Sequence, residues 1–418
     1  MRRSAVHAAN QKALSQLFAA DPILMDLRAA GDAVPGFTPR TILTSGPRLP
    51  WSLYHGGQRA AIIGAAMYEK LASSPEDAEA RIEAGDIAVL GCQELGCVGS
   101  LAGIYTASMP VFVLRDRTSG REAYCNLFEG KNPRRLNYGV YDEQVRAQLD
   151  RIRDTIAPAL AEAIRATGGI SIKPIMVRAL HMGDELHSRN AAAALLFLQA
   201  IAPSLLDIGQ RRDARPALDA IAEDPYSFLR LSMAASKVMA DAAGHVEGSS
   251  IVTAMAFNCR QFAIRVSGLG DQWWTGSLPH VEARFFKGYS ANDIAWMGGE
   301  SPITETVGLG AFAQCAAFAL QAYQGGSPQE MLKRQRRLYR IVAGEHPDFK
   351  IPFLAYRGTP SGIDIFRVVK TGVRPAMNIG IAGQGGGQIG AGVIEAPLDC
   401  FQSAVQAFGQ RYGVTRPG

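Results

Sequence analysis

Short apolar runs alternate with amphipathic stretches along this chain, which predicts strands and helices in mixed order. In the first third, DIAVLGC, MPVFVLRD and AYCNLFEG have the length and apolar character of strands. Helices are expected over residues 58–72 and from Pro75, where Ser74 is a favourable N-cap. A longer amphipathic helix should follow Asp142 and end near Thr167, because two glycines come next. The first forty residues predict a short helix and then a loop.

The same pattern predicts a helical middle and a mixed last third. Residues 174–244 are helical in character, including a helix from Pro225 to Ala243. SSIVTAMAFN and FAIRVSG predict adjacent strands, and TETVGLGAFAQCAAFALQAY predicts a buried helix. RGTPSGID is typical of a turn, and a last helix should begin at Leu398. The fold class is therefore α+β (mixed), with several interlocked α/β and helical subdomains.

The length of the chain predicts more than one compact core. A chain of 418 residues exceeds the usual size of a single domain. We expect an N-terminal mixed α/β domain over residues 1–172 and a helical segment over 173–248. A C-terminal α+β domain with a glycine-rich loop should follow over 249–418.

Charge and composition exclude some classes of partner. The net charge is only +5 and the basic residues are scattered, which does not favour a nucleic-acid-binding protein. The basic run KRQRRLYR at 333–340 is typical of a solvated helix face. The alanine-rich run after Asn190 is interrupted by Gln199 and Pro203, so no membrane span is expected. The six cysteines form no CxxC pair, and no signal peptide is recognisable, so a cytoplasmic protein is predicted.

The segment ALHMGDELHSRN, residues 179–190, holds the densest group of ionisable side chains. On a helix, His181, Asp184 and His187 would share one face because they are three residues apart. Glu185 and Arg189 are four apart and would form an ion pair on the adjoining face. The segment therefore predicts a polar site, with a helix start bearing a surface ion pair as the alternative.

A glycine loop, GQGGGQIGAG at 383–392, is the second candidate site. Gly385, Gly387 and Gly390 satisfy GxGxxG, but no βαβ unit or acidic residue follows, as a dinucleotide site requires. Its backbone N–H groups could hold an anion such as phosphate or carboxylate. The alternative is a packing loop that needs positive φ angles.

Two further motifs have mainly local explanations. In SPITETVGLG, Thr304 is expected to cap a helix and Glu305 to lie at its positive end. In GTPSGID, two glycines and a proline favour a turn. Motifs for a nucleophilic serine, a zinc protease or a cysteine-held metal are absent from the sequence. No cofactor is evident, and the sequence leaves a metal requirement open.

These motifs, taken in order, resemble one known family. ALHMGDELHSRN, SSIVTAMAFN with IRVSGLGDQWW, SPITETVGLG, GTPSGID and GQIGAG look like the YlbE-like family, and the agreement extends from about Asn10 to Phe408. One member of that family is a subunit of the oxamate carbamoyltransferase of bacterial allantoin catabolism. The resemblance implies a cytoplasmic subunit of a multi-subunit complex. Its reaction type is carbamoyl transfer between a nitrogen and phosphate, linking oxalurate with oxamate and carbamoyl phosphate.

The resemblance also implies roles for particular residues. Such a reaction needs N–H or cationic donors for phosphate and an acid or base for the amide proton. The expected catalytic residues are Asp184, His187 and Glu305. The expected substrate-binding residues are His181, Glu185, Arg189, Asn190, Asn258, Arg265, Thr304, Thr306, Gly385, Gly386, Gly387 and Gln388. The expected partners are a small amide or carbamoyl substrate and further subunits, with a homodimer as another assembly.

The chain departs from the family pattern in its polar loops. The loop before MPVFVL reads GCQELGCVGSLAG where the family carries several histidines and an asparagine, and Gly383 stands where a histidine is usual. Such loops carry substrate chemistry more often than core motifs do. Two alternatives to carbamoyl transfer therefore remain: an amide-bond hydrolase that opens a cyclic amide, imide or ureide, and a non-catalytic structural subunit.

Overall fold

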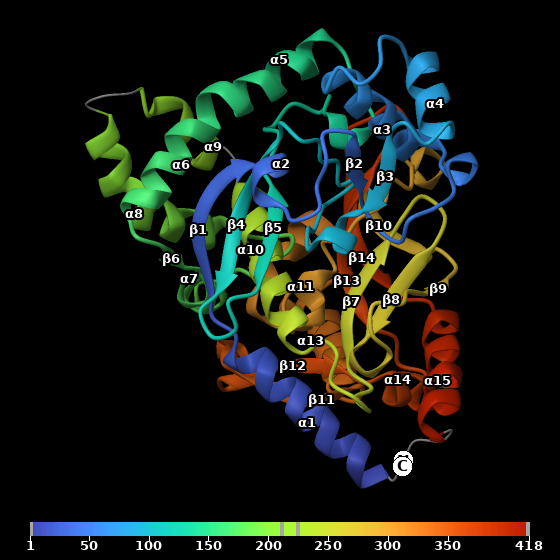
Figure 1. The fold of residues 1–418 in the computed structure, drawn as a ribbon. Coiled ribbons are helices and arrows are strands. Elements are labelled where there is room, and N and C mark those ends of the chain that lie inside the picture. Colours follow the sequence, from blue (N-terminus) through green and yellow to red (C-terminus); the bar gives the residue numbers. More distant parts are fainter. Residues whose placement is uncertain (1–2, 210–212, 223–225, 415–418) are drawn as a thin grey trace.

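The computed structural model describes residues 3–209, 213–222 and 226–414, and it confirms the mixed α+β class (Figure 1). The strands are β1 (Pro22–Ala29), β2 (Thr41–Thr44), β3 (Ala88–Gly91), β4 (Pro110–Asp116), β5 (Glu122–Asn126), β6 (Ile170–Ser171), β7 (Val252–Phe257), β8 (Phe262–Val266), β9 (Trp274–Gly276), β10 (Val281–Phe285), β11 (Val342–Ile351), β12 (Arg357–Ile363), β13 (Ala376–Ala382) and β14 (Gln388–Glu395). The α-helices are α1 (Arg3–Ala19), α2 (Ala30–Ala33), α3 (Gly56–Tyr68), α4 (Pro75–Glu83), α5 (Glu143–Arg151), α6 (Ala157–Ala166), α7 (Ile172–His181), α8 (Ala191–Ile208), α9 (Arg215–Ala222), α10 (Tyr226–Ala242), α11 (Ile303–Thr306), α12 (Gln321–Gln324), α13 (Pro328–Leu338), α14 (Ile365–Thr371) and α15 (Leu398–Tyr412).

The strands form several small sheets instead of one large one. The largest has the order β5-β4-β1-β6, and its pairs are antiparallel. Two three-stranded antiparallel sheets have the orders β7-β8-β9 and β10-β14-β13. The pairs β2-β3, which is parallel, and β11-β12 complete the arrangement.

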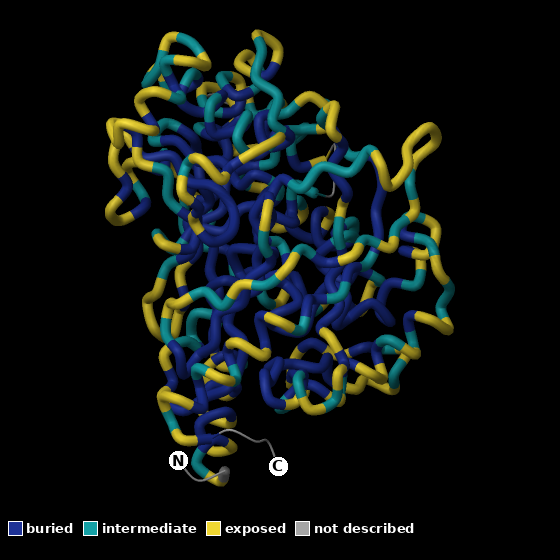
Figure 2. The backbone as a smooth tube through the Cα atoms, turned by 90° about the vertical axis from the view of Figure 1, so that its right-hand side faces the viewer, coloured by how far each residue is buried: buried dark blue, intermediate teal, exposed yellow. Residues whose placement is uncertain are grey.

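Helix α10 is the central helix of the fold and is buried along most of its length. It packs on β4 and β5 and also contacts α11 and β7, so it joins the first sheet to the second half of the chain. One hydrophobic cluster draws residues from 9 to 351 and therefore from all three predicted segments. The division at residues 172 and 248 stays a prediction. The buried backbone runs through the interior, and exposed residues concentrate along the outer loops (Figure 2).

Several predicted elements are confirmed. The Ser74 hydroxyl accepts a hydrogen bond from the backbone N–H of Asp77 and caps α4. Asp142 caps α5 in the same way, and α5 continues through one π-helical turn into α6, which ends before two glycines with positive φ. The β7–β8 hairpin, the basic helix α13 and the last helix α15 also lie where expected. Pro225, the predicted start of α10, lies outside the described residues.

Other predicted elements were wrong. Residues 22–29 form β1, a strand between β4 and β6, although a loop was expected. RGTPSGID is mostly the strand β12, because its partner β11 supplies backbone hydrogen bonds that outweigh turn propensity.

The expected buried helix after Thr304 is the four-residue α11 followed by 3₁₀ turns. Gly308 and Gly310 have φ of +93° and +57°, which ends the helix. A Cβ on Gly308 would lie 2.3 Å from the Ser361 hydroxyl, and one on Gly310 would lie 2.2 Å from the Glu305 carboxylate. The chain therefore turns tightly around Glu305.

Helix α8 is long and apolar enough to cross a membrane by length and composition, and 44% of that stretch is buried inside the protein. It packs against α6, α7 and α9, and Phe197 and Ile201 belong to the main hydrophobic cluster. A single helix of this kind is weak evidence for a membrane span, since core helices have the same character.

Candidate functional site

The HMGDELHSRN segment is a loop between α7 and α8, not a helix. Helix α7 ends at His181, and α8 begins only at Ala191. The predicted shared face of His181, Asp184 and His187 was therefore wrong: Gly183, with φ of +98°, follows the end of α7 and turns the chain away from helical geometry. His181 is exposed and packs edge-on against Tyr356, away from the other two.

The predicted Glu185–Arg189 ion pair was also wrong. The buried Glu185 carboxylate accepts hydrogen bonds from the backbone N–H groups of His187, Ser188 and Arg189. It therefore organises the loop itself. The half-exposed Arg189 side chain instead donates to the carbonyl of Gly183 at 3.1 Å and lies 3.5 Å from Asp184.

His187 and Glu305 form a buried pair that joins the loop to α11. The Nδ1 atom of His187 lies 2.9 Å and 3.0 Å from the two carboxylate oxygens of Glu305. The Thr304 hydroxyl donates to Glu305 at 2.8 Å, and the backbone N–H groups of Ala311 and Asn378 donate to the same carboxylate. Because Glu305 holds Nδ1, Nε2 is the nitrogen that His187 can offer to a ligand.

Asn378 on β13 links the two buried carboxylates. Its side-chain amide donates to Glu185 at 2.6 Å, and its backbone N–H donates to Glu305 at 2.9 Å. The carboxylates, His187 and Asn378 thus form one network contributed by three separated parts of the chain. Such a network fixes the orientation of the imidazole ring.

Electrostatics in this network favour the imidazolium form of His187. Burial lowers the pKa of His187, but the opposing charges and hydrogen bonds of Glu305, together with Glu185, outweigh it, and the net shift is upward. Burial raises the pKa of Glu185 despite the N–H donors around it. The upward shift favours the protonated ring, which is the form that can donate a proton.

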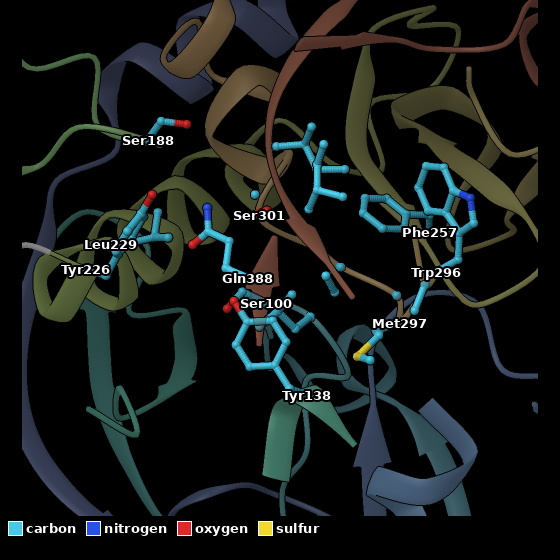
Figure 3. A pocket seen from close by; sticks show the side chains of 18 of the residues that line it. Ser100, Tyr138, Ser188, Tyr226, Leu229, Phe257, Trp296, Met297, Ser301 and Gln388 are labelled. Carbon is cyan, nitrogen blue, oxygen red and sulfur yellow. The ribbon is translucent and has the colours of Figure 1, made fainter. Parts of the chain in front are cut away.

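A cavity opens beside His187 at the meeting point of the loop, α10 and the β10-β14-β13 sheet. It contains about 910 Å³ of space free of protein atoms, part of it open to solvent. Figure 3 shows Tyr226 and Leu229 on one side and Phe257, Trp296 and Met297 on the other, with Gln388, Tyr138 and Ser100 between them. Apolar and aromatic walls with few polar groups are typical of a small-molecule site.

Two arginines of this cavity carry unsatisfied donors. Arg230 on α10 is only 3% exposed, and its Nη1 donates to Asn126 at 3.0 Å. Arg135 lies with its guanidinium 4.6 Å from the centre of the Tyr138 ring. The Nε–H group of each arginine is buried without a hydrogen-bond partner. Within the described residues, neither arginine has a carboxylate within ion-pair distance, so the pair favours an anionic ligand.

The other predicted residues are placed differently. Asp184 is buried but accepts from the backbone N–H of Ala193 at 2.9 Å, so it caps α8 instead of lining the cavity. Asn190 donates to the carbonyl of His187, and Thr306 to that of Pro302. Asn258 accepts from two backbone N–H groups of the β7–β8 turn and donates to Pro47, which is a structural role.

Arg265 lies in a separate pocket, and Gln388 lines the main cavity. Of the predicted site residues, His187 and Gln388 line the main cavity. Glu305 and Thr304 do not line it, but they contact Nδ1 of His187. The described lining does not include Asp184, His181, Glu185 or Arg189.

The glycine loop is the tip of the β13–β14 hairpin. The N–H of Gly383 donates to the carbonyl of Gly387, and that of Gly386 donates to Gly383, so these donors close the turn. Gly386 and Gly387 have φ of +84° and +74°. This geometry supports the packing-turn alternative, and anion binding by the loop stays a prediction.

Replacing Gly386 by Val is expected to destabilise the protein by about 1–3 kcal/mol, because the φ angle is unfavourable for a β-branched residue. Its Cβ would also lie 2.9 Å from the side chain of Val140. A fall in the thermal unfolding midpoint would show this effect. Gly385→Val is the matched control, since a Cβ there meets no atom within 4 Å. Equal midpoints for the two variants would contradict the prediction.

The sequence patterns missed Arg135, Arg230 and Asn378. Arg230 and Asn378 are single polar residues inside apolar runs, SFLRLSMAA and AMNIGIAG, and that interruption was the available signal. Arg135 sits in a loop with several charges and had no distinguishing pattern. In the part of the chain that the structure describes, no group of three or more His, Cys, Asp or Glu could hold a metal ion, and the six cysteines are buried and free.

Comparison with known proteins identifies the family of this chain. Residues 87–301 match the family described as oxamate carbamoyltransferase subunit AllG. The chain is 34% identical to the oxamate carbamoyltransferase subunit AllG of Escherichia coli, over 98% of this chain and 99% of that protein. It is 38% identical to the uncharacterized protein YahG of Escherichia coli, over 98% of this chain and 87% of that one.

A solved structure has the same fold. The crystal structure of a conserved protein of unknown function from Enterococcus faecalis V583 superposes with a TM-score of 0.93 at 34% identity, covering 97% of this chain and 98% of that chain. The identity to a curated relative over nearly the full length confirms the resemblance noted from the motifs. The chain belongs to the family of oxamate carbamoyltransferase subunit AllG, as a divergent member.

Proposed function

We propose that this chain is the carbamoyl-transferring subunit of a cytoplasmic multi-subunit enzyme, acting on a ureide of the oxalurate type with phosphate. The observation that carries the proposal is the His187–Glu305 pair beside a cavity that also holds Arg135 and Arg230 with unsatisfied donors. An acid–base group and an anion-binding group in one partly apolar cavity are what such a reaction requires.

The reaction can be written with these residues. A phosphate oxygen attacks the carbamoyl carbon, the new C–O bond forms, and the C–N bond to the oxamate nitrogen breaks with its electron pair remaining on nitrogen. His187 in its imidazolium form donates the proton to that nitrogen and is reprotonated by the proton that hydrogenphosphate loses. Arg135 and Arg230 hold the phosphate or the substrate carboxylate, and Glu305 keeps the ring oriented and stabilises its charge.

Aromatic side chains suit the planar ureide. The Phe257 and Trp296 rings meet edge-to-face with centres 5.4 Å apart and form one wall of the cavity (Figure 3). A flat, conjugated substrate can pack against such a wall while its carboxylate reaches an arginine. Exclusion of water by this wall would favour attack by phosphate over attack by water.

Replacing Arg135 or Arg230 by Gln is expected to weaken binding of carbamoyl phosphate by about 10- to 100-fold, since a charge-assisted hydrogen bond contributes about 1.5–3 kcal/mol. Isothermal titration calorimetry of the chain, alone and with its partner subunits, measures this change. Arg134→Gln is the matched control, because Arg134 is exposed, pairs with Asp142 and lies next to Arg135.

The outcomes separate the three functions. Wild-type affinity in both variants would contradict the assignment of the arginines. Release of oxamate from oxalurate that does not depend on phosphate would identify a hydrolase. Absence of binding to carbamoyl phosphate, oxalurate and oxamate in the assembled complex would identify a structural subunit.

A further inference from the structure

A second pocket lies on another face of α10, beside the β7–β8 hairpin. It contains about 980 Å³ of space free of protein atoms, part of it open to solvent, and shares no lining residue with the main cavity. Its walls come from the turn around Gln93, the start of β5, the end of α10 and strand β8. Unlike the main cavity, it is lined mostly by charged and polar side chains.

The lining of this pocket holds three cations and three carboxylates, but two of its guanidinium groups are in no ion pair with the described residues. Each lining carboxylate has a cationic or histidine partner: Glu122 pairs with Arg115 at 2.6 Å, Asp241 pairs with Lys237, and Asp271 lies 3.2 Å from His245. In the described part of the chain, Arg265 and Arg121 have no carboxylate within 4.0 Å. These two guanidinium groups are therefore not neutralised by a direct ion pair, although Nη1 of Arg121 donates to the backbone carbonyl of Asp241.

Two buried donors in this pocket have no partner. Arg265 is 9% exposed and Gln93 is 6% exposed, yet the Nε of Arg265 and the Nε2 of Gln93 make no hydrogen bond. The Arg265 guanidinium is held in place, because it stacks 4.4 Å from the centre of the Trp273 ring and its Nη1 donates to the Gln93 carbonyl. A buried donor without a partner is costly, so an acceptor from outside the chain would relieve both.

We propose that this second pocket binds a small oxyanion, a phosphate or a carboxylate, at a site separate from the main cavity. Arg265 and Gln93 donate to its oxygens, and Arg121 supplies further positive charge in the same lining. Guanidinium groups match the planar spacing of such oxygens, and no acceptor-poor ligand would satisfy the two free donors.

The test is a calorimetric titration with inorganic phosphate, and separately with oxamate as the carboxylate probe. In the Arg135→Gln, Arg230→Gln double variant the main cavity is disabled, and one oxyanion is expected to remain bound. Adding Arg265→Gln should abolish that binding. Arg121→Gln should weaken oxyanion binding several-fold. Because Arg121 is exposed, this substitution tests the pocket without changing a buried residue. The control is Arg117→Gln, an exposed arginine nearby on the chain that pairs with Asp21.

The result that overturns the proposal is a double variant that binds neither probe, or one whose remaining binding survives Arg265→Gln in a folded protein. Preference for phosphate over oxamate, or the reverse, identifies the class of oxyanion. This experiment is independent of the proposed function. If Arg135→Gln and Arg230→Gln left the affinity for carbamoyl phosphate unchanged, the proposed function would fail, but the effect of Arg265→Gln on phosphate or oxamate binding would still test the second pocket.

Discussion

Replacing His187 by Gln is expected to lower the rate of carbamoyl transfer by about 10²- to 10⁴-fold, the usual contribution of a positioned general acid–base. Glutamine retains a hydrogen-bonding group beside Glu305 but cannot carry a proton to the leaving nitrogen. The affinity for carbamoyl phosphate should change little, because Arg135 and Arg230 are intact. The measurement is phosphate-dependent formation of oxamate from oxalurate by the assembled complex.

The pH profile gives a second readout for the same residue. The net pKa shift of His187 is upward, so the imidazolium form persists to a higher pH than in a free histidine. The rate should fall as the pH rises above this shifted pKa, and that limb of the profile should disappear in His187→Gln. Glu305→Gln should move the limb to lower pH, since the carboxylate that stabilises the imidazolium is lost.

His181→Gln is the matched control for this prediction. His181 belongs to the same sequence motif but is exposed and packs against Tyr356. It should retain the wild-type rate and pH profile. A complex in which His187→Gln and His181→Gln have equal, wild-type rates would contradict an acid–base role for His187.

The sequence predicted the local elements of this fold better than the site. The caps at Ser74 and Asp142, the β7–β8 hairpin and the last helix depend on residues close in the chain, and all are confirmed. Strand β1 was not predicted, because it forms by pairing with β4 and β6, which lie far away in the sequence. The long helix after Thr304 was wrong because tertiary packing around Glu305 requires glycines with positive φ.

The site was predicted in residue type more than in geometry. The HMGDELHSRN motif indicated His187 as a site residue. The helical spacing, however, predicted the wrong contacts for the residues around it. Glu185 binds backbone N–H groups of its own loop, which no periodicity indicates. Arg230 comes from α10 and lines the same cavity as His187, and Asn378 comes from β13 and donates to Glu305, so only the folded chain brings them together. Contacts across 118 residues, such as His187 with Glu305, lie beyond any local pattern.

Replacing Glu300 by Gln is expected to remove a pH dependence of stability that the wild-type protein shows between about pH 4.5 and 7. Glu300 is fully buried, and this burial raises its pKa from 4.5 to about 7. Two backbone N–H donors and the cations Lys237 and Arg265 lower the pKa, but their effect is smaller than that of burial. The folded state therefore holds the proton more tightly than the unfolded state. The resulting stability is present below pH 4.5 and is lost as the pH rises to 7, by about 3 kcal/mol.

The neutral amide at position 300 cannot titrate, so the variant should have nearly the same contribution at pH 5 and pH 8. Its –NH₂ group would face the N–H of Gly46 or Gly99, which costs about 1–3 kcal/mol at low pH. Wild type should therefore exceed the variant in free energy of unfolding at pH 5, and the difference should shrink or reverse at pH 8. Urea unfolding at both pH values measures this, with Glu94→Gln, on a nearby and more exposed carboxylate, as the control. The prediction would be contradicted if the difference in free energy of unfolding between wild type and Glu300→Gln stayed constant from pH 5 to 8. The Glu300 carboxyl would then be ionised throughout this range, stabilised by the N–H groups of Gly46 and Gly99 and by the cations of the second pocket.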